Sequence, residues 1–162
     1  KKENYKINLF LAGNFIKSNL IFNFFNLSNN IDYNLIKNKK IKFMGHLNNL
    51  NKFYNKIDLL CFPSYLNALG RQVIEAGHYE IPSIVCIKKN CSDSFINKVT
   101  GLSFTKPGSL KDLENSIKYF YFNKSKINIM GKNAKKLINS NFNPKKNLKV
   151  LVNVYESALK SI

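Results

Sequence analysis

The feature that most constrains the fold is residues 62–82, where the end of an apolar run, a short polar loop and a helical pattern follow one another. The apolar run, residues 57–62, ends at Pro63, and the helical pattern begins near Leu69. Strand, glycine-bearing loop and helix in this order form half of a βαβ unit. In open parallel sheets, ligands bind where such loops meet helix N-termini, whose free N–H groups favour an anion. The stretch therefore predicts a phosphate-bearing ligand near Gly70.

The same alternation of apolar runs and helical patterns extends along most of the chain. Strands are expected at residues 7–11, 41–43, 57–62, 83–87 and 102–104, with a short helix at 47–54 and a longer one after Gly70. The pattern after Phe104 is helical. This order predicts an α/β fold, a Rossmann-like parallel sheet with helices on both faces, followed by a helical C-terminus.

Three amphipathic helices are expected in the C-terminal part. Ser109 and Asp112 resemble a capping box at the start of the first. Pro144 suits the first turn of the last. The three apolar stripes are Leu110, Leu113, Ile117 and Phe120; Ile127, Met130, Ala134 and Leu137; and Leu148, Leu151, Val152, Tyr155 and Leu159.

Composition sets the broad class of the protein. A chain of 162 residues with 44% hydrophobic residues is enough for one domain with a single core. It contains no apolar run of membrane-spanning length, and it starts at Lys1 without a Met, which reads as a fragment. The chain has three cysteines, an odd number, and they are not spaced as metal ligands are. This indicates a reducing compartment, the cytoplasm. Cys61 and Cys86 are expected to be small core residues within strands.

The formal net charge of +17 raises the alternative of a basic module that binds a membrane or RNA. Nearly all of this charge is scattered lysine, and Arg71 is the only arginine. Proteins that read nucleic acids commonly use arginine for bidentate contacts. The charge is therefore attributed mainly to a composition rich in residues with AT-rich codons, with no specific nucleic-acid partner. Attraction to a membrane or an acidic glycan is kept as an alternative.

The sequence of residues 62–82 resembles a known family signature. Retaining glycosyltransferases of the GT-B fold, often called family 4 or group 1, carry Pro-Ser, a Glu, a Gly, and a second Glu followed by Ala. Pro63-Ser64, Gly70 and Glu75-Ala76 match this signature in register, whereas Asn67 stands at the first Glu.

The resemblance continues in one order over nearly the whole chain. Residues 41–47 resemble the family's strand and glycine, and residues 81–85 resemble its Gly-x-Pro-Val-Val strand, with Glu80 beside the Gly position. Further along, Thr100-Gly101-Leu102 resembles a turn of the family, and residues 130–134 resemble the Met-Gly-x-x-Ala start of a late helix. The resemblance implies that residues 1–162 form the C-terminal, nucleotide-sugar-binding lobe of such an enzyme, N-terminally truncated. The acceptor lobe would lie upstream, and the final helix would cross back toward it.

The resemblance also implies roles for individual residues. Glu75 would bind the ribose hydroxyls of the nucleotide, because a carboxylate can accept from both hydroxyls of a diol. Asn67 would contact the donor sugar near the reacting carbon, as the catalytic candidate, although it lacks the charge of the family's Glu. The backbone N–H groups of Ala68, Leu69 and Gly70 would face the diphosphate.

Two side chains complete the expected donor site. Arg71 would add a cation at the helix start, and His46 follows a strand and a glycine, which places it at the carboxyl edge of the sheet. His46 and His78 are too few and too badly spaced for a metal, so neither a metal nor a cofactor is expected.

The function implied is transfer of a sugar from a nucleotide diphosphate sugar to a glycan or lipid-linked acceptor, with retention at the anomeric carbon. The enzyme would work in the cytoplasm, including the inner face of the membrane, and the present chain alone would be inactive. The absence of a Glu at Asn67 favours the alternative of a degenerate, non-catalytic member that only binds nucleotide sugar.

Overall fold

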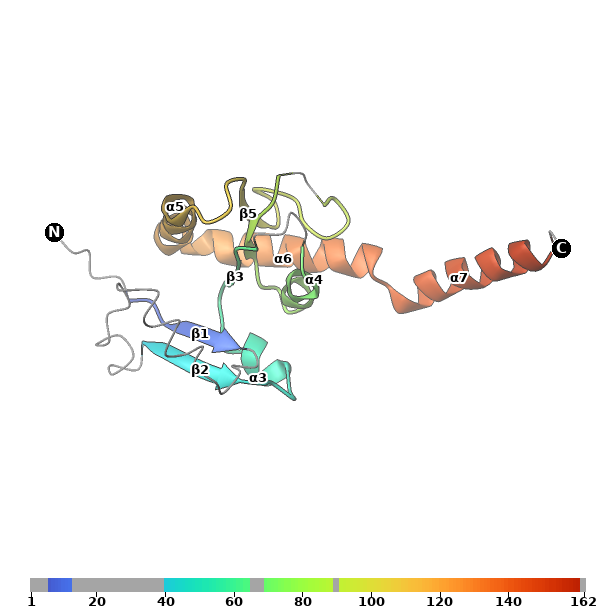
Figure 1. Cartoon of the computed structure of the whole chain (residues 1–162), viewed down its shortest axis with the longest axis horizontal. Helices are drawn as coiled ribbons and strands as arrows, with labels where there is room; N and C mark the ends of the chain where they lie inside the picture. The colour runs from blue at the N-terminus through green and yellow to red at the C-terminus, as the bar shows by residue number, and fades with distance from the viewer. Residues whose placement is uncertain (1–5, 13–39, 65–68, 89–90, 161–162) are drawn as a thin grey trace. The chain divides into compact units, whose positions relative to one another are not determined.

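The computed structural model describes residues 6–12, 40–64, 69–88 and 91–160, which belong to two compact units, residues 1–53 and 54–162 (Figure 1). In the first unit, β1 (Leu9–Ala12) pairs in parallel with β2 (Ile41–Gly45), with Leu9 opposite Ile41. A short helix, α3 (Asn51–Tyr54), follows, and its last residue, Tyr54, belongs to the second unit. Gly45 ends β2 with a φ of 65°, a left-handed conformation that glycine adopts most readily.

The second unit contains a three-stranded parallel sheet in the order β3 (Leu60–Phe62), β4 (Ser83–Cys86) and β5 (Gly101–Phe104). Helix α4 (Arg71–His78) connects β3 to β4. Helices α5 (Leu110–Phe122), α6 (Lys124–Asn141) and α7 (Pro144–Leu159) follow β5. The α/β, Rossmann-like class with parallel strands and a helical C-terminus is confirmed, and the five strands pair as two sheets.

The core of the second unit lies around β4. All four residues of this strand are buried, as expected for a strand covered on both faces. Ile84 and Cys86, which share one face because side chains alternate along a strand, pack with Phe104, Phe120 and Met130 from β5, α5 and α6. Helix α4 contacts β3 and β4.

Helix α6 lies very close to α4 and to the turn that follows it. Gly77 of α4 faces Ala134 and Ile138 of α6. One turn earlier on α6, a side chain at Gly131 would collide with the backbone carbonyl oxygen of Glu80. Glu80 itself has a φ of 60°, and Lys135 Nζ lies 2.9 Å from its Oε1. This hydrogen bond and the charge of Lys135 lower the pKa of the Glu80 carboxyl.

Several sequence predictions need correction in detail. Strand β3 starts at Leu60 rather than at residue 57, because sheet pairing begins where Leu60 N–H donates to the Pro82 carbonyl. Half of the capping box at α5 is confirmed: Ser109 Oγ accepts from Asp112 N–H at 3.3 Å, whereas Ser109 N–H donates to the Lys106 carbonyl at 3.2 Å. Leu110 was expected in the stripe of this helix but is 79% exposed.

Other predicted core positions also differ. In α6 Ile138 is buried rather than Leu137. The prediction of a core cysteine holds for Cys86 and is wrong for Cys61, which is exposed. All of α7 is exposed, including the predicted apolar stripe of Leu148, Leu151, Val152, Tyr155 and Leu159.

Candidate functional site

The predicted donor loop leads into the N-terminus of α4. Leu69 and Gly70 directly precede the helix, while Asn67 and Ala68 lie outside the described residues. The helix begins at Arg71, two residues later than predicted, because Gly70 has an extended backbone with φ −79° and ψ 158°. This φ is open to any residue, so space and not strain explains the glycine. A Cβ at Gly70 would lie 2.5 Å from Cζ of Phe62, at the end of β3.

Glu75 is the fifth residue of α4, little more than one turn into the helix. Its side chain is 21% exposed. Both carboxylate oxygens are engaged: the Tyr54 hydroxyl donates to Oε2 at 2.9 Å, and Arg71 Nε lies 3.0 Å from Oε1. These two contacts explain how a carboxylate is accommodated on this largely buried side of α4, because partly buried charges need donors.

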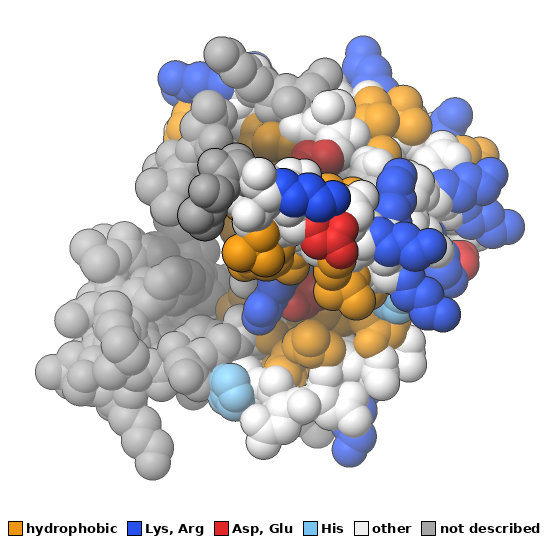
Figure 2. All heavy atoms as spheres, turned by 90° about the vertical axis from the view of Figure 1, so that its right-hand side faces the viewer, with side chains coloured by type: hydrophobic (Ala, Val, Ile, Leu, Met, Phe, Trp, Pro, Cys, Tyr) orange, Lys and Arg blue, Asp and Glu red, His pale blue; other side chains and the backbone are white. Residues whose placement is uncertain are grey.

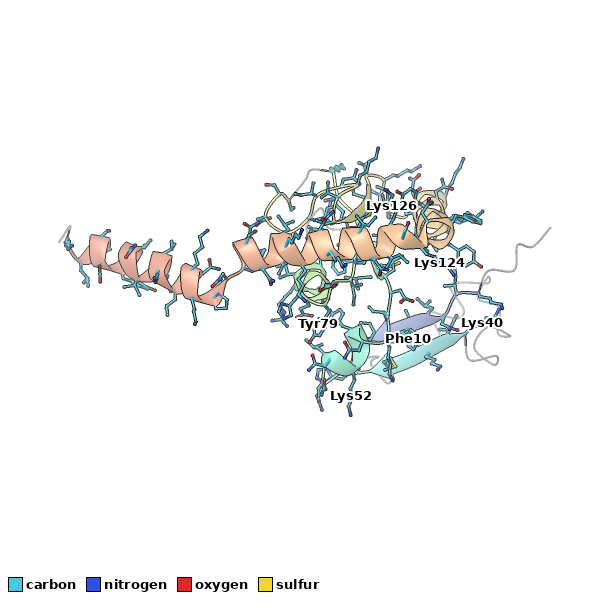
Figure 3. All side chains as sticks on the ribbon, turned by 180° about the vertical axis from the view of Figure 1, so that it is seen from behind. Phe10, Lys40, Lys52, Tyr79, Lys124 and Lys126 are labelled. Carbon is cyan, nitrogen blue, oxygen red and sulfur yellow. The ribbon has the colours of Figure 1, made fainter. Side chains whose placement is uncertain are left out.

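Tyr54 comes from the end of α3 and is only 3% exposed. Its ring stacks on that of Tyr79, with centroids 4.9 Å apart and ring planes 16° from parallel. Tyr79, labelled in Figure 3, directly follows α4. Burial and the hydrogen bond to the Glu75 carboxylate raise the pKa of Tyr54 far above its ordinary value of 10.0. The phenol is therefore a permanent neutral donor.

Arg71 occupies the first position of α4, as predicted for a cation at the helix start. Its side chain is 86% exposed, and its guanidinium is turned toward Glu75, one turn further along the helix. Exposed helical pairs at this spacing contribute roughly 0.3–0.5 kcal/mol, because water screens them and both side chains lose freedom. A ligand can therefore displace or share this contact at little cost.

His46 directly follows β2 and is exposed, which confirms its place at the carboxyl end of a parallel strand. It belongs to the first compact unit, so its part in a donor site with Glu75 stays a prediction.

Tyr54 is not among the site residues that the sequence predicts. The only local signal was a tyrosine at the end of the predicted helix 47–54, directly before a strand. Its contact with Glu75 joins residues 21 positions apart, a separation that local patterns do not report.

The described residues contain neither a metal-binding cluster nor a membrane-spanning helix. Among those residues, no three His, Cys, Asp or Glu side chains gather as they would around a metal ion. Nor is any described helix both long enough and apolar enough to cross a bilayer.

The parallel strands, the covering helices and the loop entering α4 place this chain in the class of Rossmann-like α/β proteins. The family described as "Glycosyl transferases group 1" matches residues 1–137, and the chain belongs to that family. The sequence is 25% identical over 126 residues to the capsular polysaccharide biosynthesis glycosyltransferase CapM of Staphylococcus aureus. That match covers 78% of this chain and 33% of CapM.

Solved structures share the fold. Sucrose-phosphate synthase from Thermosynechococcus elongatus superposes with a TM-score of 0.80 at 21% identity, over 96% of this chain and 39% of that protein. HepE from Anabaena, solved in complex with UDP, superposes with a TM-score of 0.77 at 19% identity, over 93% of this chain and 41% of HepE. These neighbours have the GT-B fold. The chain thus spans well under half of each of these three proteins.

Proposed function

We propose that residues 1–162 are the C-terminal, donor-binding lobe of a glycosyltransferase that moves a sugar from a nucleotide diphosphate sugar to a glycan or lipid-linked acceptor, with retention. The observation that carries the proposal is the position of the Glu75 carboxylate. It lies on α4, just after the loop that enters this helix, and it is held by the Tyr54 hydroxyl and the Arg71 guanidinium. Family membership, the role of CapM in capsular polysaccharide synthesis and the UDP complex of HepE support it.

In the proposed site, each group meets one part of the donor. The Glu75 carboxylate accepts hydrogen bonds from the ribose diol. The N–H groups of residues 68–70 and the Arg71 guanidinium face the diphosphate, where they offset the charge of the leaving group. Asn67 orients a hydroxyl of the sugar. In this proposal the protein's own N–H groups and guanidinium stabilise the diphosphate, and neither a metal nor a cofactor is required.

In this role the chain would be one lobe of a larger enzyme. The exposed apolar side chains of α7 are what a helix that packs on a second lobe would present. The acceptor site would lie in that other lobe, so the present chain alone should bind donor without transferring sugar.

The test is turnover and nucleotide binding by the full-length protein, measured with a panel of UDP-, GDP- and ADP-sugars. Asn67→Ala should lower turnover about tenfold, because one hydrogen bond to the donor is lost in the transition state. Asn67→Glu should keep or raise turnover, because a negative charge is added where positive character develops on the sugar. Binding without turnover across the whole panel would instead support the degenerate, non-catalytic alternative.

The second candidate, a basic module on an anionic membrane at the inner face of the cytoplasmic membrane, rests on the net charge of +17. On the face that Figure 2 shows, Lys and Arg side chains are spread among hydrophobic and neutral ones. Such dispersion favours composition as the source of the charge. We therefore expect weak, headgroup-independent binding to vesicles at physiological salt. Co-sedimentation with vesicles measures this binding. Tight binding to phosphatidylserine vesicles that weakens steeply with added salt would favour the membrane candidate.

A further inference from the structure

We infer that Tyr54 is a positioning residue that holds the Glu75 carboxylate ready for the ribose diol and thereby sets the preference for ribonucleotides over deoxyribonucleotides. This inference rests on the proposed nucleotide-binding function of Glu75. Its physical basis is the hydrogen bond of 2.9 Å from the Tyr54 hydroxyl to Glu75 Oε2.

The acceptor capacity of Glu75 fits a diol. A carboxylate offers about four lone-pair sites, two on each oxygen. Counting contacts with the described residues, Tyr54 takes one site on Oε2 and Arg71 takes one on Oε1. About one site on each oxygen is then left, and the two hydroxyls of a ribose can fill both. A deoxyribose fills only one.

Of the two donors that the described residues place around Glu75, one is fixed and the other is mobile. Tyr54 is buried and stacked on Tyr79, so its hydroxyl has little freedom to follow the carboxylate. Arg71 is almost fully exposed on a flexible side chain. Without the Tyr54 hydroxyl, a mobile guanidinium would be the one donor that the described residues still offer the carboxylate. The carboxylate would then lose the single orientation in which both oxygens meet both hydroxyls.

The direction of the Tyr54 hydrogen bond is also fixed. Burial and the neighbouring carboxylate keep the pKa of Tyr54 far above physiological pH, so the phenol always donates and never competes as an anion. The Glu75 carboxylate therefore acts as an acceptor toward both the protein and the ligand.

The test compares Tyr54→Phe with wild type in the full-length protein by calorimetry. The ligands are the member of the UDP, GDP and ADP set that wild type binds most tightly, and its 2′-deoxy analogue. Phe keeps the ring stack and deletes only the hydroxyl. We expect Tyr54→Phe to weaken binding of the ribonucleotide about three- to tenfold and to leave the deoxy analogue nearly unchanged. Tyr119→Phe, the same change on α5, should alter neither affinity.

A second measurement is a double-mutant cycle with Glu75→Gln. If Tyr54 acts through Glu75, Tyr54→Phe should have little further effect on ribonucleotide affinity in the Glu75→Gln background. The ribo-to-deoxy ratio is taken within one protein sample, so a reduced folded fraction cancels from it.

The outcomes separate this inference from the proposed function. Equal weakening of both nucleotides by Tyr54→Phe would show a merely structural tyrosine and overturn the inference. A ribonucleotide preference that Glu75→Gln abolishes and Tyr54→Phe leaves intact would also overturn it, while the proposed function stands. A wild-type protein that binds none of the three nucleotides would overturn the proposed function itself.

Discussion

Glu75→Gln is expected to weaken nucleotide binding about ten- to a hundredfold, because hydrogen bonds to a charged acceptor are worth roughly 1.5–3 kcal/mol. The substitution keeps size and shape but removes the charge. It also upsets the local pairing. The Tyr54 hydroxyl and the Arg71 guanidinium both donate to Glu75, and an amide has a single oxygen. The NH₂ group of the new amide would therefore bring a donor against a donor.

The chain offers a matched control for this prediction. Glu114 of α5 pairs with Lys118 at 3.0 Å, the same helical spacing as Glu75 with Arg71, but its side chain is 62% exposed. Glu114→Gln makes the same chemical change and breaks the same kind of pair. Titration of the full-length protein with nucleotide should find a loss only for Glu75→Gln. Equal affinity of both variants and wild type, with the fold intact, would remove Glu75 from the nucleotide site.

Local pattern sufficed for the order of elements. Apolar runs such as residues 83–86 are buried at every position, and this burial produces the continuous hydrophobic stretch that marks the strand. Boundaries were less accurate, because they depend on contacts with distant residues. Strand β3 starts where its backbone meets Pro82, and α4 starts where the extended backbone of Gly70 ends.

The family resemblance pointed to Thr100 and Gly101, and the structure shows why a threonine and a glycine are needed at these positions. Thr100 is buried, and its hydroxyl accepts from Ile96 N–H at 2.9 Å and donates to the Ile96 carbonyl at 3.1 Å. At Gly101 a side chain would collide with the carbonyl of Ser83. These positions shape the approach to β5 and need no ligand to explain them. Tyr54 lay beyond any such pattern, because its significance comes from a tertiary contact with Glu75.

The same holds for the start of the late helix. Met130 lies in the core, Gly131 faces the Glu80 backbone, and Ala134 faces Gly77. Small residues let α6 lie against α4 and the turn that follows it. Lys124 and Lys126, labelled in Figure 3, mark the N-terminal end of this helix. The sequence showed which residues stand here, and the packing of α6 explains why two of them are small.

Gly131→Ala is expected to lower the free energy of unfolding by about 3 kcal/mol, which corresponds to a fall in Tm of about 6–12 °C for a protein of this size. An added Cβ would lie 2.7 Å from the carbonyl carbon of Glu80 and closer still to its oxygen. This backbone cannot easily retreat. Two residues later the Pro82 carbonyl accepts from Leu60 N–H at 3.1 Å, and that bond joins the turn to the sheet.

Gly77→Ala provides the matched control, since Gly77 is also a buried glycine inside a helix. There the nearest obstacle to a Cβ is a side-chain atom, Cγ1 of Ile138 at 2.7 Å, and no backbone atom lies closer than 3.6 Å. Alanine also favours the helix by about 1 kcal/mol over glycine. Thermal unfolding of the full-length protein should therefore show a clearly smaller loss for Gly77→Ala than for Gly131→Ala. Similar Tm values for the two variants would mean that α6 can move away from the Glu80 turn, and that its close approach is not a fixed part of the fold.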